Sequence, residues 1–334
     1  MEGTTIFNIA SDGIRCALSP LGASIASVQV RDRRGRFIDV ALAPKCLFDS
    51  TPDPFTAGRT IGPCCGHVRD GRISIDDVPF QLTQNEGANH IHGGPNGATF
   101  QLWTSRQLSA TCVCFELKLP DGLDGYPGKR TLRAEYAVEG SCLSVIYSAT
   151  TDRATWMDMT NHVYWDLGGH FDGSALDQIL EISAKQVVFN GEGHLPVKIL
   201  PAEGIFDFTR PATLSGNMNL SPAHEQLVLA RGYNNAWLLD DDLRRAKQFA
   251  ARLYAPSTGI RMTMDTDQPA IVLYSGGFLN EKNRIMDGVA SPACALALEA
   301  QQLPDPFHLP GARPEPLRPG ERFRREIVWR FEAM

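Results

Sequence analysis

The 334-residue sequence predicts an all-β fold, a large antiparallel β-sandwich, on the basis of three observations. Short runs alternate apolar and polar residues, as strands with one buried face do. Thirty glycines and 22 prolines, the residues typical of turns, punctuate these runs. Helices of a dozen residues, which a parallel α/β sheet needs between its strands, are not found.

The predicted elements follow from these patterns in chain order. Residues 14–18, 25–30, 143–147 and 260–264 alternate with period two and are predicted to be antiparallel strands. Only residues 221–229 and 240–247 look helical. Residues 40–60 and 188–215 are rich in proline and irregular, so they are expected to be long loops over a sheet. No linker or composition shift divides the chain, which is predicted to be a single domain over residues 1–334.

Composition argues against several classes of partner. Lys plus Arg total 32 against 38 for Asp plus Glu, a net charge of −6 without a basic stripe, so nucleic acid is not expected. The apolar runs are strand-sized and shorter than the ~20 residues that span a bilayer, so no membrane partner is expected. Residues 1–13 lack the basic and apolar regions of an export signal. The eight cysteines lack zinc spacing and are expected to be free thiols in the cytoplasm.

The first of three polar segments, residues 85–94, carries His90 and His92 ahead of Gly93 and Gly94. In an extended chain the two histidines would point to the same face. The two glycines let the backbone turn sharply or approach a ligand closely. A metal site is not favoured here, because no carboxylate or third histidine lies at a recognisable spacing.

The second segment, residues 159–169, places His162 near Asn161, Tyr164 and Trp165 in a run that alternates like a strand. One side of such a strand would line a polar, aromatic-walled pocket. Imidazole, with an ordinary pKa of about 6.5, gives and takes protons near neutral pH. The alternative is a half-buried histidine held by hydrogen bonds.

The third segment, residues 295–305, has Glu299 in an apolar, strand-like run. A carboxylate there must be paired, turned to the surface or functional, because burial of an unpaired charge costs several kcal/mol. The alternative is a glutamate on an edge strand facing solvent.

Eight motifs in order resemble the aldose 1-epimerase, or galactose mutarotase, family. They are LGASIASVQVRDRRGRFIDVAL, TIGPCCGHVRDGRISIDD, NEGANHIHGG, MTNHVYWDLGG, GIFDFTRP, RGYNNAWLLD, DTDQPAIVLYSGGFL and ALEAQQLPDPFHLPGARPEPLRPGERFRREIVWRF. The resemblance runs nearly end to end, and it implies a large, single-domain antiparallel β-sandwich.

The resemblance also implies an enzyme, an isomerase that interconverts the α and β anomers of a free aldose. Glu299 matches the family's catalytic base, His162 its general acid, and His92 a second histidine that holds the sugar. The base takes the anomeric hydroxyl proton while the acid protonates the ring oxygen, so the ring opens and recloses. No metal or organic cofactor is implied. The expected partner is a monosaccharide, and the expected state is a monomer or homodimer.

The binding residues depart from the family. His67 stands where the family has an arginine, Asn234 where it has an aspartate, and Val272 where it has a glutamine. Arg69 or Arg72 would replace the arginine if the strand brought either to the same side. These changes predict an altered specificity, for a deoxygenated or acidic aldose. The alternative is sequence drift that leaves a mutarotase of broad specificity.

The predicted substrate-binding residues are His67, His92, His162, Tyr164, Asn234 and Glu299, with Tyr164 expected to stack on the sugar. Two other functions stay open. One is a non-catalytic carbohydrate-binding protein of the same fold. The other is a mutarotase for a phosphorylated or sulfonated sugar, anchored by Arg59, Arg69 and Arg72.

Overall fold

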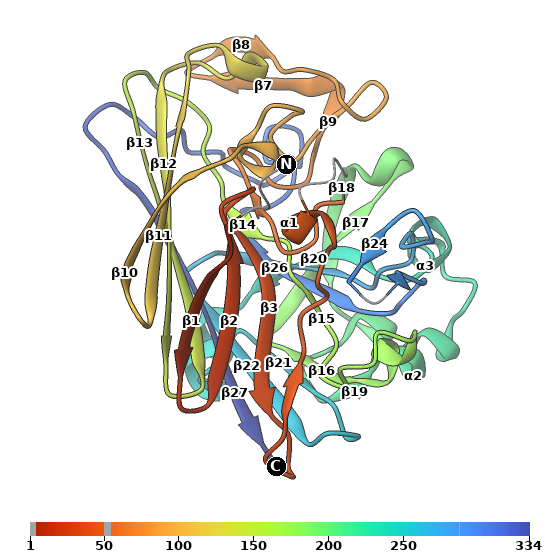
Figure 1. The fold of residues 1–334 in the computed structure, drawn as a ribbon. Helices are drawn as coiled ribbons and strands as arrows, with labels where there is room; N and C mark the ends of the chain where they lie inside the picture. Colours follow the sequence, from red (N-terminus) through yellow and green to blue (C-terminus); the bar gives the residue numbers. More distant parts are fainter. Residues whose placement is uncertain (1–4, 50–54, 287) are drawn as a thin grey trace.

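The structure, a computed structural model, describes residues 5–49, 55–286 and 288–334, and its largest element is a nine-stranded antiparallel sheet (Figure 1). In spatial order its strands are β10 (Thr104–Ser109), β11 (Cys112–Leu119), β12 (Arg130–Glu139), β13 (Cys142–Thr151), β27 (Phe323–Ala333), β22 (Ile260–Thr266), β21 (Ala251–Tyr254), β16 (Ile179–Ile182) and β19 (Ala212–Thr213).

A second, six-stranded sheet carries three of the six predicted site residues, Tyr164, Asn234 and Glu299. Its strands, in spatial order, are β15 (Tyr164–Trp165), β26 (Leu296–Gln301), β23 (Ala270–Tyr274), β20 (Asn234–Leu239), β17 (Ala184–Asn190) and β18 (Pro196–Pro201). A four-stranded sheet precedes both in the chain: β1 (Phe7–Ser11), β2 (Ile14–Ser19), β3 (Ser24–Arg31) and β4 (Phe37–Asp39).

Smaller elements complete the fold. The two-stranded pairs are β5 (Thr60–Ile61) with β14 (Thr160–Asn161), β6 (His67–Val68) with β9 (His90–Ile91), β7 (Arg72–Ile75) with β8 (Val78–Gln81), and β24 (Arg284–Ile285) with β25 (Gly288–Val289). The α-helices are α1 (Cys46–Asp49), α2 (Leu214–Leu220), α3 (Glu225–Ala230) and α4 (Asp241–Lys247). Short 3₁₀ turns occupy Arg69–Gly71, Ala98–Phe100, Leu123–Gly125, Ser174–Asp177, Glu192–His194 and Gly204–Phe206. No helix of the described residues is long and apolar enough to span a membrane.

The prediction of an all-β fold of antiparallel sheets is confirmed. Its strands form because apolar and polar side chains alternate along them. In β12, Leu132, Ala134, Tyr136 and Val138 are buried while their neighbours are partly exposed. Such side chains, together with Trp329 and others of β27, form one large apolar cluster with the inward faces of β20, β23 and β26. Each fully buried aliphatic side chain contributes roughly 1.5–3 kcal/mol relative to exposure.

Two local predictions need correction. Residues 188–215 are not one loop, since they contain the end of β17 and all of β18. Prolines begin and end β18, and they are tolerated because it is the edge strand of its sheet. Helix α2 was not predicted, because its sequence LSGNMNL contains a glycine and two asparagines. Its N-cap, Thr213, accepts a hydrogen bond from the Gly216 N–H. In the 40–60 loop, which includes α1 and β5, residues 50–54 lie outside the described residues.

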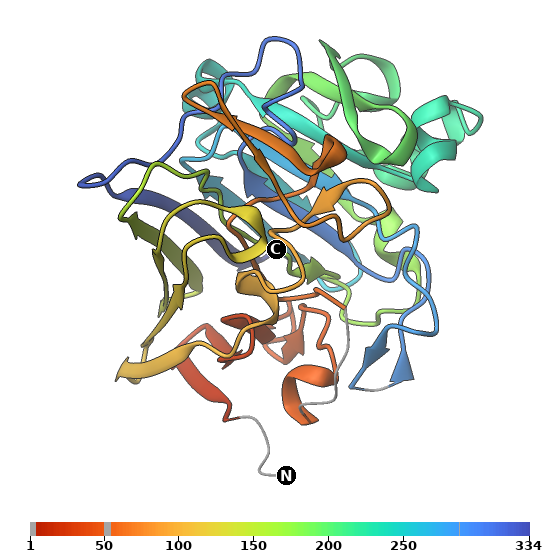
Figure 2. The ribbon, with the colours of Figure 1, turned by 90° about the horizontal axis from the view of Figure 1, so that it is seen from above.

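The segment around His162 is two short strands, not one. Residues 160–161 pair with β5, whereas residues 164–165 pair with β26. Between them, the His162 N–H donates to the Arg59 carbonyl and its own carbonyl accepts from the Gly58 N–H, each at 2.9 Å. Figure 1 shows the β7–β8 hairpin at the top of the molecule, and Figure 2 shows the same fold from above.

Candidate active site

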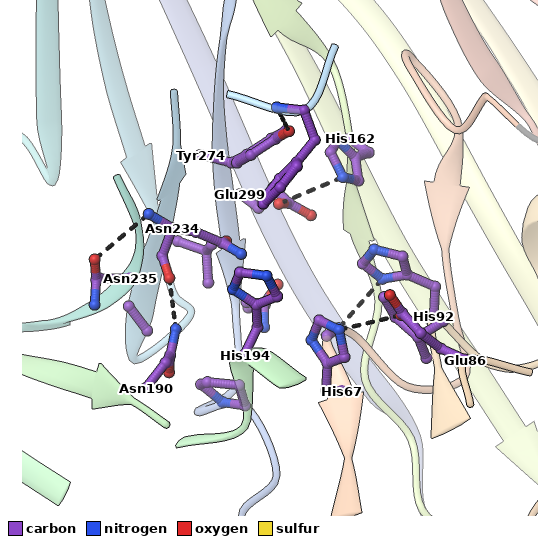
Figure 3. Close-up of a pocket in the computed structure, with 17 residues that line it drawn as sticks. His67, Glu86, His92, His162, Asn190, His194, Asn234, Asn235, Tyr274 and Glu299 are labelled. Carbon is purple, nitrogen blue, oxygen red and sulfur yellow. Dashed lines mark hydrogen bonds and ion pairs between the residues drawn. The ribbon is translucent and has the colours of Figure 1, made fainter. Parts of the chain in front are cut away.

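A pocket of about 340 Å³ lies on the face of the six-stranded sheet that is turned away from the large apolar cluster. This volume is at the small end of the roughly 300–1,000 Å³ range of small-molecule sites. The polar side chains that line it are His67, Glu86, His92, His162, Asn190, His194, Asn234, Asn235, Tyr274, Glu299 and Gln301 (Figure 3). No lysine or arginine is among the described residues of its wall.

Glu299 is held at the centre of the pocket floor. It lies on β26, which is flanked by β15 and β23, and only 3% of the residue is exposed. A glutamate on a solvent-facing edge strand is therefore excluded. Burial, reinforced by the negative charge of Asp158, raises the pKa of Glu299 to about 8. Its Oε2 is buried and has no hydrogen-bond partner in the described part of the chain.

His162 faces Glu299, with 3.7 Å between its Nε2 and the carboxyl Oε1 (Figure 3). Burial lowers the pKa of His162 to about 4. The ring of Tyr164 stacks beneath it, with the two ring centroids 4.9 Å apart and the planes 22° from parallel. The electron-rich face of a phenol favours a cation above it, so this stacking both orients the imidazole and favours its protonated form.

His92 completes a group of three at the floor. Its ring meets His162 edge to face, at a centroid distance of 5.4 Å. Its Nδ1 accepts the Gly66 N–H at 3.2 Å. Burial and the neighbouring His162 lower the pKa of His92 well below its ordinary value. A neutral imidazole that accepts at Nδ1 carries its proton at Nε2, so His92 is a hydrogen-bond donor at that atom.

The expectation that His90 and His92 share a face is wrong. The backbone of His92 has a φ of 51°, and Gly93 and Gly94 follow at 80° and 90°, so the extended conformation ends at residue 91. His90 instead turns inward, where its ring nitrogens contact the Tyr126 hydroxyl and the Thr83 carbonyl, each at 2.7 Å. Of the two histidines, only His92 belongs to the pocket.

A second group of titratable residues lies at the side of the pocket opposite Glu299 in Figure 3. His67 Nε2 is 3.1 Å from Glu86 Oε2, and its ring is 6.0 Å from that of His194. Contact with His67 lowers the pKa of Glu86. Glu86 and His194 were not predicted, and no local signal marks them, since each reaches the pocket from an irregular segment.

A third group presents neutral hydrogen-bonding side chains. Asn234 pairs with Tyr274 across β20 and β23. The Tyr274 hydroxyl accepts the Phe278 N–H at 2.8 Å and keeps its own proton for donation. The side-chain amide of Asn234 makes no hydrogen bond within the described residues. Tyr274 was missed because its alternation with buried neighbours is also typical of a core position.

The structure brings together five of the six predicted site residues: His67, His92, His162, Asn234 and Glu299. Tyr164 needs correction. It is 4% exposed and packs between Phe55, Tyr274 and His162, so it supports the acid and does not line the pocket.

The three arginines predicted as an anchor for an anionic sugar are not part of the pocket wall. Arg59 is buried, with Nη1 3.4 Å from the Thr99 carbonyl. Arg72 is exposed on β7, and the backbone of Arg69 is tied to Asp305. None therefore replaces the family arginine at the position of His67. No group of three His, Cys, Asp or Glu with the geometry of a metal site occurs among the described residues.

Fold and site together define a class: an all-β protein that holds a buried carboxyl group opposite an imidazole in a small polar pocket. The family model for aldose 1-epimerase matches residues 6–330. The chain is 30% identical to human galactose mutarotase over 330 residues, which cover 98% of this chain and 94% of the relative. It is 29% identical to aldose 1-epimerase of Escherichia coli K12, covering 96% and 93%.

Two solved structures share the fold of this chain. Galactose 1-epimerase from Lactobacillus acidophilus superposes with a TM-score of 0.83 at 26% identity, over 98% of this chain and 94% of that one. An aldose epimerase homologue from C. elegans superposes with a TM-score of 0.86 at 24% identity, over 99% of both chains. This chain belongs to the aldose 1-epimerase family, a family of isomerases that act on monosaccharides.

Proposed function

We propose that this protein is a mutarotase, which interconverts the α and β anomers of a free aldose through Glu299 and His162. The observation that carries the proposal is the buried pair itself, with 3.7 Å between carboxyl oxygen and imidazole nitrogen on the floor of a pocket of monosaccharide size. Perturbed acid–base groups that face each other in a cavity are typical of catalytic sites.

The two shifted pKa values give the pair one proton near neutral pH. Between about pH 4 and pH 8 Glu299 keeps its proton and His162 has none. Transfer of that proton to His162 yields a carboxylate base and an imidazolium acid without a change in total charge. Sugar hydroxyl groups in the pocket would favour this ionised form, because they supply hydrogen bonds to the buried carboxylate and imidazolium.

Ring opening then balances as two proton transfers. The Glu299 carboxylate takes the proton of the anomeric hydroxyl, a C=O bond forms at C1, the bond from C1 to the ring oxygen breaks, and His162 protonates that oxygen. Rotation about the C1–C2 bond exposes the other face of the aldehyde. Reclosure reverses both transfers and restores the pair. His92, a donor at Nε2, holds an oxygen of the sugar near His162.

The residues of the pocket wall favour an uncharged sugar, and they differ from those of the family, so we expect a different substrate specificity. His67 and Asn234, which replace an arginine and an aspartate, remove one permanent charge of each sign. The described wall contains Glu86 but no cation with permanent charge. A phosphate or sulfonate would meet no lysine or arginine there, so we favour a neutral aldose over an anionic one. The cysteine side chains, most of them buried, support a further proposal, that the enzyme works in the cytoplasm.

A non-catalytic sugar-binding protein is the second candidate. The free energy needed to bury two titratable groups argues against this candidate. Burial keeps Glu299 protonated and His162 unprotonated near neutral pH. A binding site gains little from two such groups, since uncharged amides bind sugar hydroxyls at a lower cost.

NMR magnetisation exchange between anomers, measured over a panel of free aldoses, tests the proposal. Exchange faster than in buffer is expected for the wild type and is expected to vanish in Glu299→Gln and His162→Asn. The exposed Glu203→Gln, away from the pocket, is the matched control and should retain full activity. Tight sugar binding without accelerated exchange would support the binding protein and overturn the mutarotase.

A further inference from the structure

One row of side chains runs straight across the pocket floor. Val272 on β23 is the register partner of Glu299 on β26, and Ala236 on β20 is the register partner of Val272. All three line the pocket. Register partners in antiparallel strands have their Cβ atoms about 4.5–5.5 Å apart. When C1 of a sugar lies at Glu299, Val272 is therefore close enough to face an atom bonded to C1.

The two residues beside Glu299 make this part of the floor apolar. Val272 and Ala236 belong to a small cluster with Val188, Leu303 and Leu309, separate from the large apolar cluster. The polar groups lie one row away. Asn234 and Tyr274 are each two residues along their strands, roughly 7 Å from this row. They are placed to bind hydroxyl groups further from the anomeric carbon.

The order of strands orients a sugar on this floor. His162 precedes β15, and the sheet order is β15, β26, β23. The imidazole and Val272 are therefore on opposite sides of Glu299. C1 bonds to the anomeric oxygen, the ring oxygen and C2. With the anomeric oxygen at Glu299 and the ring oxygen at His162, C2 lies on the Val272 side.

We infer that Val272 and Ala236 select aldoses that have no hydroxyl group at the carbon next to the anomeric carbon, that is, 2-deoxyaldoses. A hydroxyl group placed against these side chains gives up its hydrogen bonds to water and gains no protein partner. A methylene group at the same position buries apolar surface at no such cost. This inference rests on the proposed function, because it presumes the sugar orientation that the acid–base pair requires.

Matched sugar pairs test the inference in the purified full-length protein. Anomer exchange is measured for 2-deoxyglucose against glucose and for 2-deoxyribose against ribose. Each catalysed rate is divided by the spontaneous rate of the same sugar, so that intrinsic reactivity cancels. We expect the 2-deoxy sugar to be favoured roughly tenfold or more in kcat/KM. D-Fucose against D-galactose, a pair that differs only at C6, is the positional control and should show no comparable preference.

Two substitutions separate this inference from the proposed function. Val272→Gln supplies hydrogen-bonding groups and should abolish or reverse the preference for the 2-deoxy sugars. Val272→Thr, nearly isosteric, should reduce it and serves if the larger side chain disturbs the fold. Equal rates for both members of each pair, unchanged by either substitution, would overturn the inference and leave the mutarotase intact. No acceleration for any sugar would overturn both.

Discussion

The floor and the wall of the pocket are built in opposite ways. On the floor, Glu299 and His162 are almost fully buried, and burial moves their pKa values to about 8 and about 4. On the wall, Glu86 has 49% of its side chain exposed and Asn234 is partly exposed. The difference teaches that the chemistry depends on exclusion of water, whereas recognition depends on which polar groups the wall presents. Substitutions on the floor should therefore change kcat, and those on the wall KM.

The largest effect is expected on the floor. Glu299→Gln should reduce anomer exchange by roughly 10²–10⁴-fold, the usual contribution of an acid–base group. It should also stabilise the fold. The folded chain keeps the Glu299 proton up to about pH 8 whereas the unfolded chain loses it near 4.5, so stability falls as pH rises between these values.

Glutamine cannot ionise and removes this penalty, which is roughly 3–4 kcal/mol at pH 7. Urea unfolding at pH 5 and pH 8 measures it. The stabilisation by Glu299→Gln should be larger at pH 8 than at pH 5. An equal or smaller stabilisation at pH 8 would contradict the raised pKa of Glu299.

The support beneath the floor should matter next. Tyr164→Leu removes the ring stacked under His162 and should lower kcat roughly three- to tenfold, in line with the energy of an aromatic pair, while KM changes little. Tyr164→Phe keeps the ring and is the matched control. If Tyr164 bound the sugar directly, KM would rise instead, and steady-state kinetics separates the two outcomes.

A wall substitution should show the opposite signature. His67→Ala removes a hydrogen-bonding group and its contact with Glu86, and KM should rise roughly three- to tenfold while kcat is kept. Glu86→Gln, which leaves the His67 ring in place, should have the smaller effect. A fall in kcat with unchanged KM would assign His67 to the floor.

The smallest effect is expected from Asp158, which is buried and accepts the Gln302 N–H at 3.1 Å and a Gln268 amide hydrogen at 3.3 Å. Its negative charge helps to raise the pKa of Glu299. Asp158→Asn should therefore move the alkaline limb of the pH profile to lower pH without loss of the maximum rate. A shift to higher pH, or none, would show that Asp158 does not influence the proton on Glu299.

The sequence predicted the sheets well and the pocket in part, for physical reasons. Alternation alone identified β2, β3, β13 and β22, because each has one buried face. Glu299 was conspicuous as a charge in an apolar run.

Other positions had no such signal. The directions in which His90 and His92 face depend on a left-handed backbone conformation at residue 92. The sequence indicated this conformation only through the two glycines that follow. Tyr164 was misplaced because a strand pattern does not tell which aromatic ring is covered by its neighbours. Glu86 and His194 approach only through tertiary packing of irregular segments.

The pH dependence of kcat/KM for anomer exchange, from about pH 3.5 to 9.5, tests the shared proton of Glu299 and His162 most directly. The account predicts a bell: activity is lost below about pH 4, where the pair gains a second proton, and above about pH 8, where it loses its only one. Glu299→Gln and His162→Asn should each abolish the bell. A rate that rises steadily with hydroxide, and is the same in Glu299→Gln, would contradict the account.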